Sequence, residues 1–260
     1  SLVFSQLAMV RMAGLVPLHQ EDEGREGWLR RMLRRFSGDG VCGSRFVDLL
    51  RAERYHDMFT GLVPGKVKEL LLMAAASPRF RDVVVHDYVS AFDEAEQTQF
   101  AAVAFTYPGR FTYLAFRGTD RSWVGWKEDF NMAFASPVPA QESARRYVDQ
   151  MAARVSTPLV LGGHSKGGNL AVYAAAKASP QAAVRIVSVY DHDGPGFPEG
   201  VLSQAELDRV RPLVRKTVPQ ESLVGLLMES DVGYRVVKSA GHGIGQHSPF
   251  LWEIEDGAAV

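Results

Sequence analysis

Residues 158–176 read PLVLGGHSKGGNLAVYAAA, and this stretch decides the predicted fold. The short apolar run from Leu159 to Leu161 is typical of a buried strand, and the Ala-rich run from Asn169 to Lys177 is typical of a helix. A glycine-rich turn, Gly162 to Gly168, joins the two. The sequence therefore predicts that the chain passes from a strand into a helix within a few residues.

The turn carries the pattern Gly163-x-Ser165-x-Gly167, which is typical of a nucleophile elbow. A reversal this tight forces the serine into a strained backbone conformation, and the flanking glycines let strand and helix approach without a Cβ clash. Ser165 would then project its hydroxyl above the sheet edge, at a helix N-terminus whose free N–H groups favour a developing anion. The alternative is a glycine-rich turn that binds a phosphate or no ligand at all.

The composition is that of a globular protein, because 46% of the 260 residues are hydrophobic and 23% are charged. This length suffices for a sizeable core, and we expect one α/β domain over residues 1–260. The net charge of −1 gives no global field that would favour nucleic acid. No apolar run of about 18 residues predicts a transmembrane helix, and no signal peptide is visible. The single cysteine, Cys42, cannot form an internal disulfide, which fits a cytoplasmic location.

The first 78 residues have helical patterns, and we expect them to pack as a helical layer on a core formed by residues 79–260. The pattern predicts helices within Ser1 to Met12, Glu21 to Phe36, Arg45 to Arg54 and Lys66 to Ala76.

Strand patterns begin at Asp82. Three Val- and aromatic-rich runs with short connections predict antiparallel neighbours: Asp82 to Asp93, Thr98 to Thr106 and Phe111 to Arg117. Helices and strands then alternate. Helices are predicted over 122–134, 141–155, 167–178 and 203–210, and strands over 159–161, 184–190, 214–218 and 234–238. This order favours a mixed, mostly parallel sheet with helices on both faces.

A serine nucleophile needs a base, and the chain order Ser, acid, His of this elbow type places that base downstream of Ser165. His247 lies in a loop, Gly243 to Pro249, after the last strand pattern and before an apolar tail. It is the preferred base, with His242 as the rival. His164, inside the elbow, is expected to pack under the turn and to point away from the hydroxyl.

The acid that orients the base is expected at the same sheet edge as the serine. Asp193 follows the strand after the elbow helix and precedes a Gly-Pro-Gly turn that would fix its backbone. Asp191 is close enough to substitute, and Glu221, after the next strand, is the other alternative. An aspartate that only caps a turn is the structural interpretation of the same residues.

Two oxyanion donors are expected at this edge. The N–H of the residue after the nucleophile, Lys166, is the first, and its side chain is expected at the rim of the pocket. The third strand ends in Phe116-Arg117-Gly118-Thr119-Asp120, where Thr119 offers both an N–H and a hydroxyl. Each such donor contributes about 3 kcal/mol to the transition state.

Several motifs resemble known families. Phe116-Arg117-Gly118-Thr119, with Trp126 and Asp129, resembles the FRGT signature of class 3 lipases, and Gly163 to Gly168 resembles their GHSLGG elbow. More closely, the chain resembles the bacterial family of unknown function DUF2974, also called Mbeg1-like. Four pieces carry that likeness: the opening 1–7, the elbow GHSKGGNLA, the motif DGPGF at 193–197, and the tail QHSPxxW at 246–252.

The resemblance implies an α/β-hydrolase fold of lipase-like topology. It also implies Ser165 and His247 as catalytic residues and Thr119 as the oxyanion residue. In class 3 lipases the acid follows the strand after the one that leads to DGPGF. Here that region reads Gln220-Glu221-Ser222 and contains no aspartate.

The sequence thus predicts a serine hydrolase that cleaves a carboxylic ester of a small molecule or a lipid, with no metal or cofactor. A catalytically inactive hydrolase-fold binding or scaffold protein is one alternative, and a thioesterase or acyltransferase with the same site is another. Residues 122–139 are rich in aromatic side chains, and they are expected to form a lid, an acyl-pocket wall or a helix with a buried face.

Overall fold

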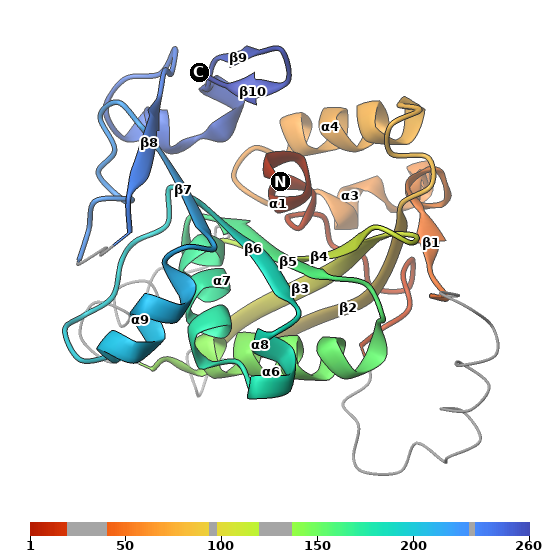
Figure 1. Cartoon of the computed structure of the whole chain (residues 1–260). Helices are drawn as coiled ribbons and strands as arrows, with labels where there is room; N and C mark the ends of the chain where they lie inside the picture. Colours follow the sequence, from red (N-terminus) through yellow and green to blue (C-terminus); the bar gives the residue numbers. More distant parts are fainter. Residues whose placement is uncertain (20–40, 94–97, 120–136, 229–231) are drawn as a thin grey trace.

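The computed structural model describes residues 1–19, 41–93, 98–119, 137–228 and 232–260. Its centre is an eight-stranded sheet in the order β1-β2-β3-β4-β5-β6-β7-β8 (Figure 1). Strands β1 to β4 pair antiparallel and β4 to β8 pair parallel, so the predicted mixed sheet is confirmed. The strands are β1 Ser44–Arg45, β2 Val84–Asp93, β3 Thr98–Tyr107, β4 Phe111–Phe116, β5 Leu159–His164, β6 Ile186–His192, β7 Val214–Pro219 and β8 Tyr234–Val237. A small hairpin of β9 Ile254–Glu255 and β10 Ala258–Ala259 follows.

Helices lie on both faces of the sheet (Figure 1). Helices α1 Leu2–Leu7, α3 Tyr55–Met58 and α4 Pro64–Ala76 lie on one face. On the other lie α6 Pro139–Arg154, α7 Lys166–Lys177, α8 Pro180–Ala183 and α9 Gln204–Val210. The short 3₁₀-helices are η1 Phe46–Leu49, η2 Ala52–Arg54, η3 Gly243–His247 and η4 Pro249–Leu251. The predicted helices on both faces of a mostly parallel sheet are confirmed.

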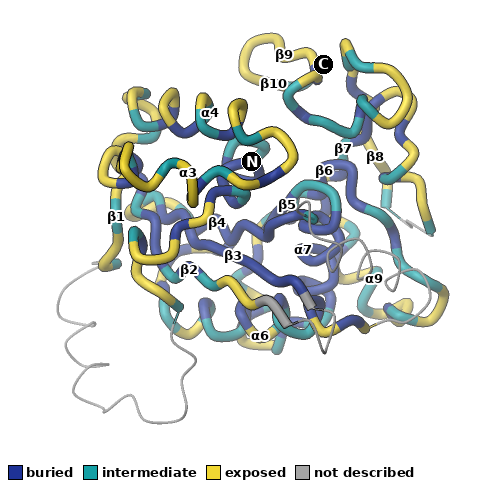
Figure 2. The backbone as a smooth tube through the Cα atoms, turned by 180° about the vertical axis from the view of Figure 1, so that it is seen from behind, coloured by how far each residue is buried: buried dark blue, intermediate teal, exposed yellow. Residues whose placement is uncertain are grey.

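The two faces of the sheet bury separate apolar clusters. The central strands and α7 are buried along most of their length (Figure 2). Alternation along β4 divides its side chains between them: Leu114 and Phe116 pack toward α6 and α7, whereas Tyr113 and Ala115 pack toward α1 and α4. The ring of Phe4 in α1 stacks on Phe105 of β3 at 4.9 Å between centroids. The N-terminal helices therefore contribute to a core that the sheet completes.

One predicted helix is wrong. Over Arg45 to Arg54 the chain forms an edge strand and then two 3₁₀ turns, η1 and η2. Phe46 and Leu49 are the buried residues of η1, and their spacing of three matches the repeat of a 3₁₀-helix. Pairing of Ser44 and Arg45 with β2 also takes up the start of the segment. The predicted helices over 21–36 and 122–134, together with Trp126 and Asp129, lie outside the described residues.

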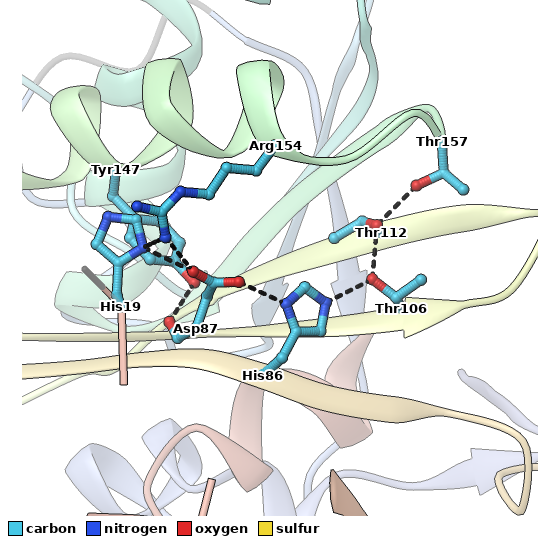
Figure 3. A network of polar contacts seen from close by, with 8 residues as sticks. All are labelled: His19, His86, Asp87, Thr106, Thr112, Tyr147, Arg154 and Thr157. Carbon is cyan, nitrogen blue, oxygen red and sulfur yellow. Dashed lines mark hydrogen bonds and ion pairs between the residues drawn. The ribbon is translucent and has the colours of Figure 1, made fainter. Parts of the chain in front are cut away.

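A buried polar network joins the N-terminal segment to the sheet and to α6 (Figure 3). Its centre is Asp87, which has a φ of 49° where the β2–β3 register shifts. One carboxylate oxygen contacts His19 Nδ1 at 3.0 Å and Arg154, and the other contacts His86 Nδ1 at 2.7 Å. The hydroxyl of Tyr147 donates to the Asp87 carbonyl at 2.8 Å. The bulge therefore places one carboxylate between three cationic or imidazole groups.

The network continues through three threonine hydroxyls. His86 Nε2 contacts Thr106 Oγ1 at 2.7 Å, and the hydroxyls of Thr106, Thr112 and Thr157 follow at 2.7 Å each. Burial alone would raise the pKa of Asp87. The hydrogen bonds from His19 and His86 and the charge of Arg154 instead hold that pKa well below its usual value.

None of the described helices is long and apolar enough to cross a membrane.

Candidate active site

The elbow has the geometry that its glycines predict. Ser165, between β5 and α7, has φ 58° and ψ −132°, a conformation that a non-glycine residue rarely adopts. Its N–H donates to the His192 carbonyl at 2.9 Å, which fixes the turn against β6. A Cβ on Gly163 would collide with Gly167, and one on Gly167 would collide with the Phe116 carbonyl. The two glycines therefore let helix α7 pass close to the sheet, with Ser165 at its N-terminus.

Asp193 and His247 form a hydrogen-bonded pair at the edge of the sheet where the elbow lies. Asp193 directly follows β6, and His247 is the last residue of η3. The distance between Asp193 Oδ2 and His247 Nδ1 is 2.6 Å, and the Asp193 side chain is fully buried. Because a carboxylate accepts, Nδ1 carries the proton and Nε2 is left as the basic nitrogen. This arrangement orients an imidazole as a general base.

Asp191 lies near the end of β6, two residues before Asp193, and has another partner. Lys216 Nζ contacts Asp191 Oδ2 at 3.1 Å and donates to the Gly194 carbonyl at 2.7 Å. The second oxygen of Asp191 accepts from the Gly194 N–H at 2.8 Å. Burial raises the pKa of Asp191, and the Lys216 charge counteracts that rise. The ion pair therefore fixes the turn after Asp193 and does not contact His247.

Glu221 also has partners other than an imidazole. Its Oε2 accepts from Gln246 Nε2 at 2.8 Å and from the Gly243 N–H at 3.1 Å. Its own N–H donates to Gln246 Oε1 at 3.0 Å. Of the three candidate carboxylates, Asp193 is the one whose carboxylate contacts His247. The rival base His242 is exposed and precedes η3.

His164 packs against His247. Its ring lies against that of His247 at 4.5 Å between centroids, and its Nε2 donates to the His247 carbonyl at 2.7 Å. Burial lowers the pKa of His164 well below its usual value, and the nearby His247 lowers it further. His164 is therefore a neutral support for the base. Burial also lowers the pKa of His192 to about 3.

Of the two residues expected to hold an oxyanion, Lys166 follows Ser165 in the chain and Thr119 follows Gly118. Gly118 is packed so closely on the elbow that a Cβ there would be 2.7 Å from the His164 carbonyl and 3.5 Å from Ser165 Cβ. The next residue, Thr119, is partly buried. The Lys166 side chain is not at a pocket rim, because it is 2% exposed and its Nζ donates to the Gln99 carbonyl at 3.0 Å. A buried ammonium needs such an acceptor, and the start of β3 supplies it.

Sequence reasoning missed two contacts of the pair. Ser222 donates from its hydroxyl to Asp193 Oδ1, and its Oγ accepts from the Gly225 N–H at 2.9 Å. His164 holds the backbone of His247, as described above. Ser222 does lie within the region 220–222 that was considered for the acid, but no local pattern indicates its partner.

Among the described residues, no group of three or more His, Cys, Asp or Glu side chains could hold a metal ion.

A family model described as Mbeg1-like matches residues 74–260, which confirms the resemblance drawn from the motifs. A comparison with curated proteins found no match. Among solved structures, the chain is similar to a deletion mutant of the Rhizomucor miehei lipase propeptide complex, with 16% identity and a TM-score of 0.44. That match covers 61% of this chain and 56% of the lipase, so the chain spans less than two thirds of it.

Lipase II from Rhizopus niveus is similar with 15% identity and a TM-score of 0.43, over 82% of this chain and 81% of the lipase. A triacylglycerol lipase from Penicillium expansum is similar with 13% identity and a TM-score of 0.40, over 61% of this chain and 71% of that chain.

Proposed function

We propose that this chain, which belongs to the Mbeg1-like family, is a serine hydrolase that cleaves a carboxylic ester through an acyl-enzyme. One observation carries the proposal. The hydrogen-bonded pair Asp193–His247 lies at the sheet edge where Ser165 is held in the strained elbow conformation. Strain of this kind is typical of functional sites, and a buried carboxylate bonded to an imidazole is the support that a serine nucleophile needs.

The reaction that this site supports has two halves. Ser165 Oγ attacks the ester carbonyl carbon while His247 Nε2 takes the hydroxyl proton, and the imidazolium then gives that proton to the leaving alkoxide. The acyl group remains on Ser165. Water attacks it with His247 again as base, which releases the acid and restores the serine. Asp193 stabilises the imidazolium at both stages.

The oxyanion of both tetrahedral intermediates would be held by the Lys166 N–H at the start of α7 and by Thr119. The Lys166 N–H lies at the start of this 12-residue helix, and the partial positive charge of a helix N-terminus favours an anion there. The close packing of Gly118, the residue before Thr119, on the elbow supports this role for Thr119. Donors fixed in this way stabilise the transition state more than the ground state.

A fluorophosphonate probe tests the proposal directly, because it phosphonylates only an activated serine. The wild-type protein is expected to be labelled, and Ser165→Ala is expected to abolish the labelling. Peptide mapping by mass spectrometry would locate the modified residue. A folded wild-type protein that shows no Ser165-dependent labelling would support the inactive binding protein and contradict the hydrolase.

A lipid-like substrate is the finer part of the proposal, and exposed apolar side chains support it. Leu223 is 62% exposed beside Ser222, and Ile244 is 65% exposed three residues before His247. We expect kcat/KM for p-nitrophenyl esters to rise with acyl length, by at most about fourfold per methylene if each one gains about 0.8 kcal/mol on burial. Ile244→Ser should weaken this trend, whereas Met73→Ser on α4 should not. A preference for acetate over longer chains would contradict the lipid assignment.

A further inference from the structure

Two consecutive residues after β7 hold the two sides of the acid–base pair. We propose that Ser222 positions the acid Asp193 and that Glu221 positions the loop of the base His247. Both are positioning residues, since neither contacts the reacting atoms. The inference rests on the proposed hydrolase function and adds to it the part of the chain that sets the geometry of the pair.

The contact of Ser222 with Asp193 is buried. Ser222 is 7% exposed and Asp193 is 0% exposed, and the Ser222 hydroxyl donates to Asp193 Oδ1 while Oδ2 faces His247. The Gly225 N–H donates to the same hydroxyl at 2.9 Å, which leaves its proton directed at the carboxylate. Without this hydroxyl, one oxygen of a buried carboxylate would lose a donor, which is costly. The carboxylate would then be free to rotate away from the imidazole.

Glu221 fixes the base loop through Gln246, the residue before His247. The Gln246 amide makes two bonds to Glu221, at 2.8 Å to the carboxylate and at 3.0 Å from the backbone N–H. The same carboxylate oxygen accepts from the Gly243 N–H at 3.1 Å, at the first residue of η3. The first and fourth residues of the five-residue helix η3 are therefore both tied to the Glu221 carboxylate. The Gln246 carbonyl also accepts from Trp252 Nε1 at 2.8 Å, which holds the far side of the loop.

The two supports lie on one short piece of backbone, so their separation is fixed. The Asp193 N–H donates to the Thr217 carbonyl at 2.8 Å, which ties the acid loop to β7 itself. Residues 221 and 222 then extend from β7 and reach Asp193 and Gln246. A single segment thus sets the distance between acid and base. This explains why Glu221 lies near the pair although it does not contact the imidazole.

The rate of Ser165 labelling by a fluorophosphonate measures this positioning. Glu221→Ala and Ser222→Ala are expected to slow labelling about ten- to a hundredfold, since each loses a hydrogen bond to a charged group. On a p-nitrophenyl ester the loss should appear in kcat, with KM nearly unchanged. Glu221→Gln should stay within about threefold of wild type, because its amide oxygen can accept both bonds that Oε2 accepts. Such a rescue separates a support from a triad acid.

Two matched controls remove the same groups elsewhere. Ser203→Ala deletes the hydroxyl that caps α9, and Glu69→Ala deletes an exposed carboxylate on α4. Both should be labelled at the wild-type rate. If Ser222→Ala does not fold, Ser222→Cys keeps the volume with a weaker donor and is expected to be slowed as well.

The outcomes separate this inference from the proposed function. A wild-type protein that is labelled, together with alanine variants that are labelled equally fast, would overturn the positioning role and leave the hydrolase intact. A loss of about ten-thousandfold in Glu221→Gln would make Glu221 the acid and overturn the inference as well. If the wild-type protein is not labelled, the proposed hydrolase function is refuted, and the inference that rests on it is refuted with it.

Discussion

Replacing Asp193 with Asn is expected to lower kcat about ten-thousandfold, with little change in the free energy of unfolding. The amide keeps the shape of the carboxylate and can still accept from Ser222. It no longer stabilises the imidazolium, however, and an amide N–H facing His247 Nδ1 favours the wrong tautomer. Steady-state turnover of a p-nitrophenyl ester, together with the labelling rate of Ser165, measures the effect.

Glu221→Gln is the matched control for this prediction, because it also exchanges a carboxylate for an amide next to the same pair. Its kcat should remain close to that of the wild type. If Asp193→Asn loses less than about tenfold while Glu221→Gln loses more, the assignment of the acid is reversed. Asp191→Asn is a poorer control, because it breaks the buried ion pair with Lys216.

Replacing Asp87 with Ala is expected to lower the free energy of unfolding by about 3–5 kcal/mol, the usual cost of breaking a buried ion pair. The substitution leaves Arg154 and two imidazoles without the carboxylate that they share. The Arg154 side chain is 8% exposed, so water replaces the lost partner poorly. Urea unfolding at neutral pH measures the difference from wild type.

Asp57→Ala is the control, since Asp57 pairs with a histidine at an exposed site and should change stability by about 0–1 kcal/mol. The effect of Asp87 should also depend on pH. The folded-state pKa of Asp87 lies below the unfolded value of about 3.9, so its stabilisation is complete above about pH 4 and declines as the pH falls further. The free energies of unfolding of the wild type and of Asp87→Ala should therefore converge as the pH falls. If the difference in the free energy of unfolding between the two proteins is the same at neutral and acidic pH, this account is contradicted.

Much of the fold follows from local patterns. The helix over Lys66 to Ala76 and the strand pattern of 111–117 match α4 and β4 to within two residues. The 3₁₀ turns at 46–54 were not predictable, because the choice between helix types depends on where Phe46 and Leu49 find apolar partners. The burial of the Lys166 side chain likewise depends on a carbonyl of β3, 67 residues away in the chain.

The sequence alone predicts the elbow and the chain order Ser, acid, His, because glycine spacing and the change from strand to helix are local properties of the chain. The choice of carboxylate is not. Asp193 and His247 are 54 residues apart, and Ser222, which bonds Asp193, is 29 residues from it. Asp191 lies near the end of β6, and Asp193 and Glu221 follow the neighbouring parallel strands β6 and β7, so the sequence places all three where an acid is expected. Only the packing of the loops after β6 and β7 against η3 decides that Asp193 contacts the imidazole, while Lys216 pairs with Asp191 and Gln246 with Glu221.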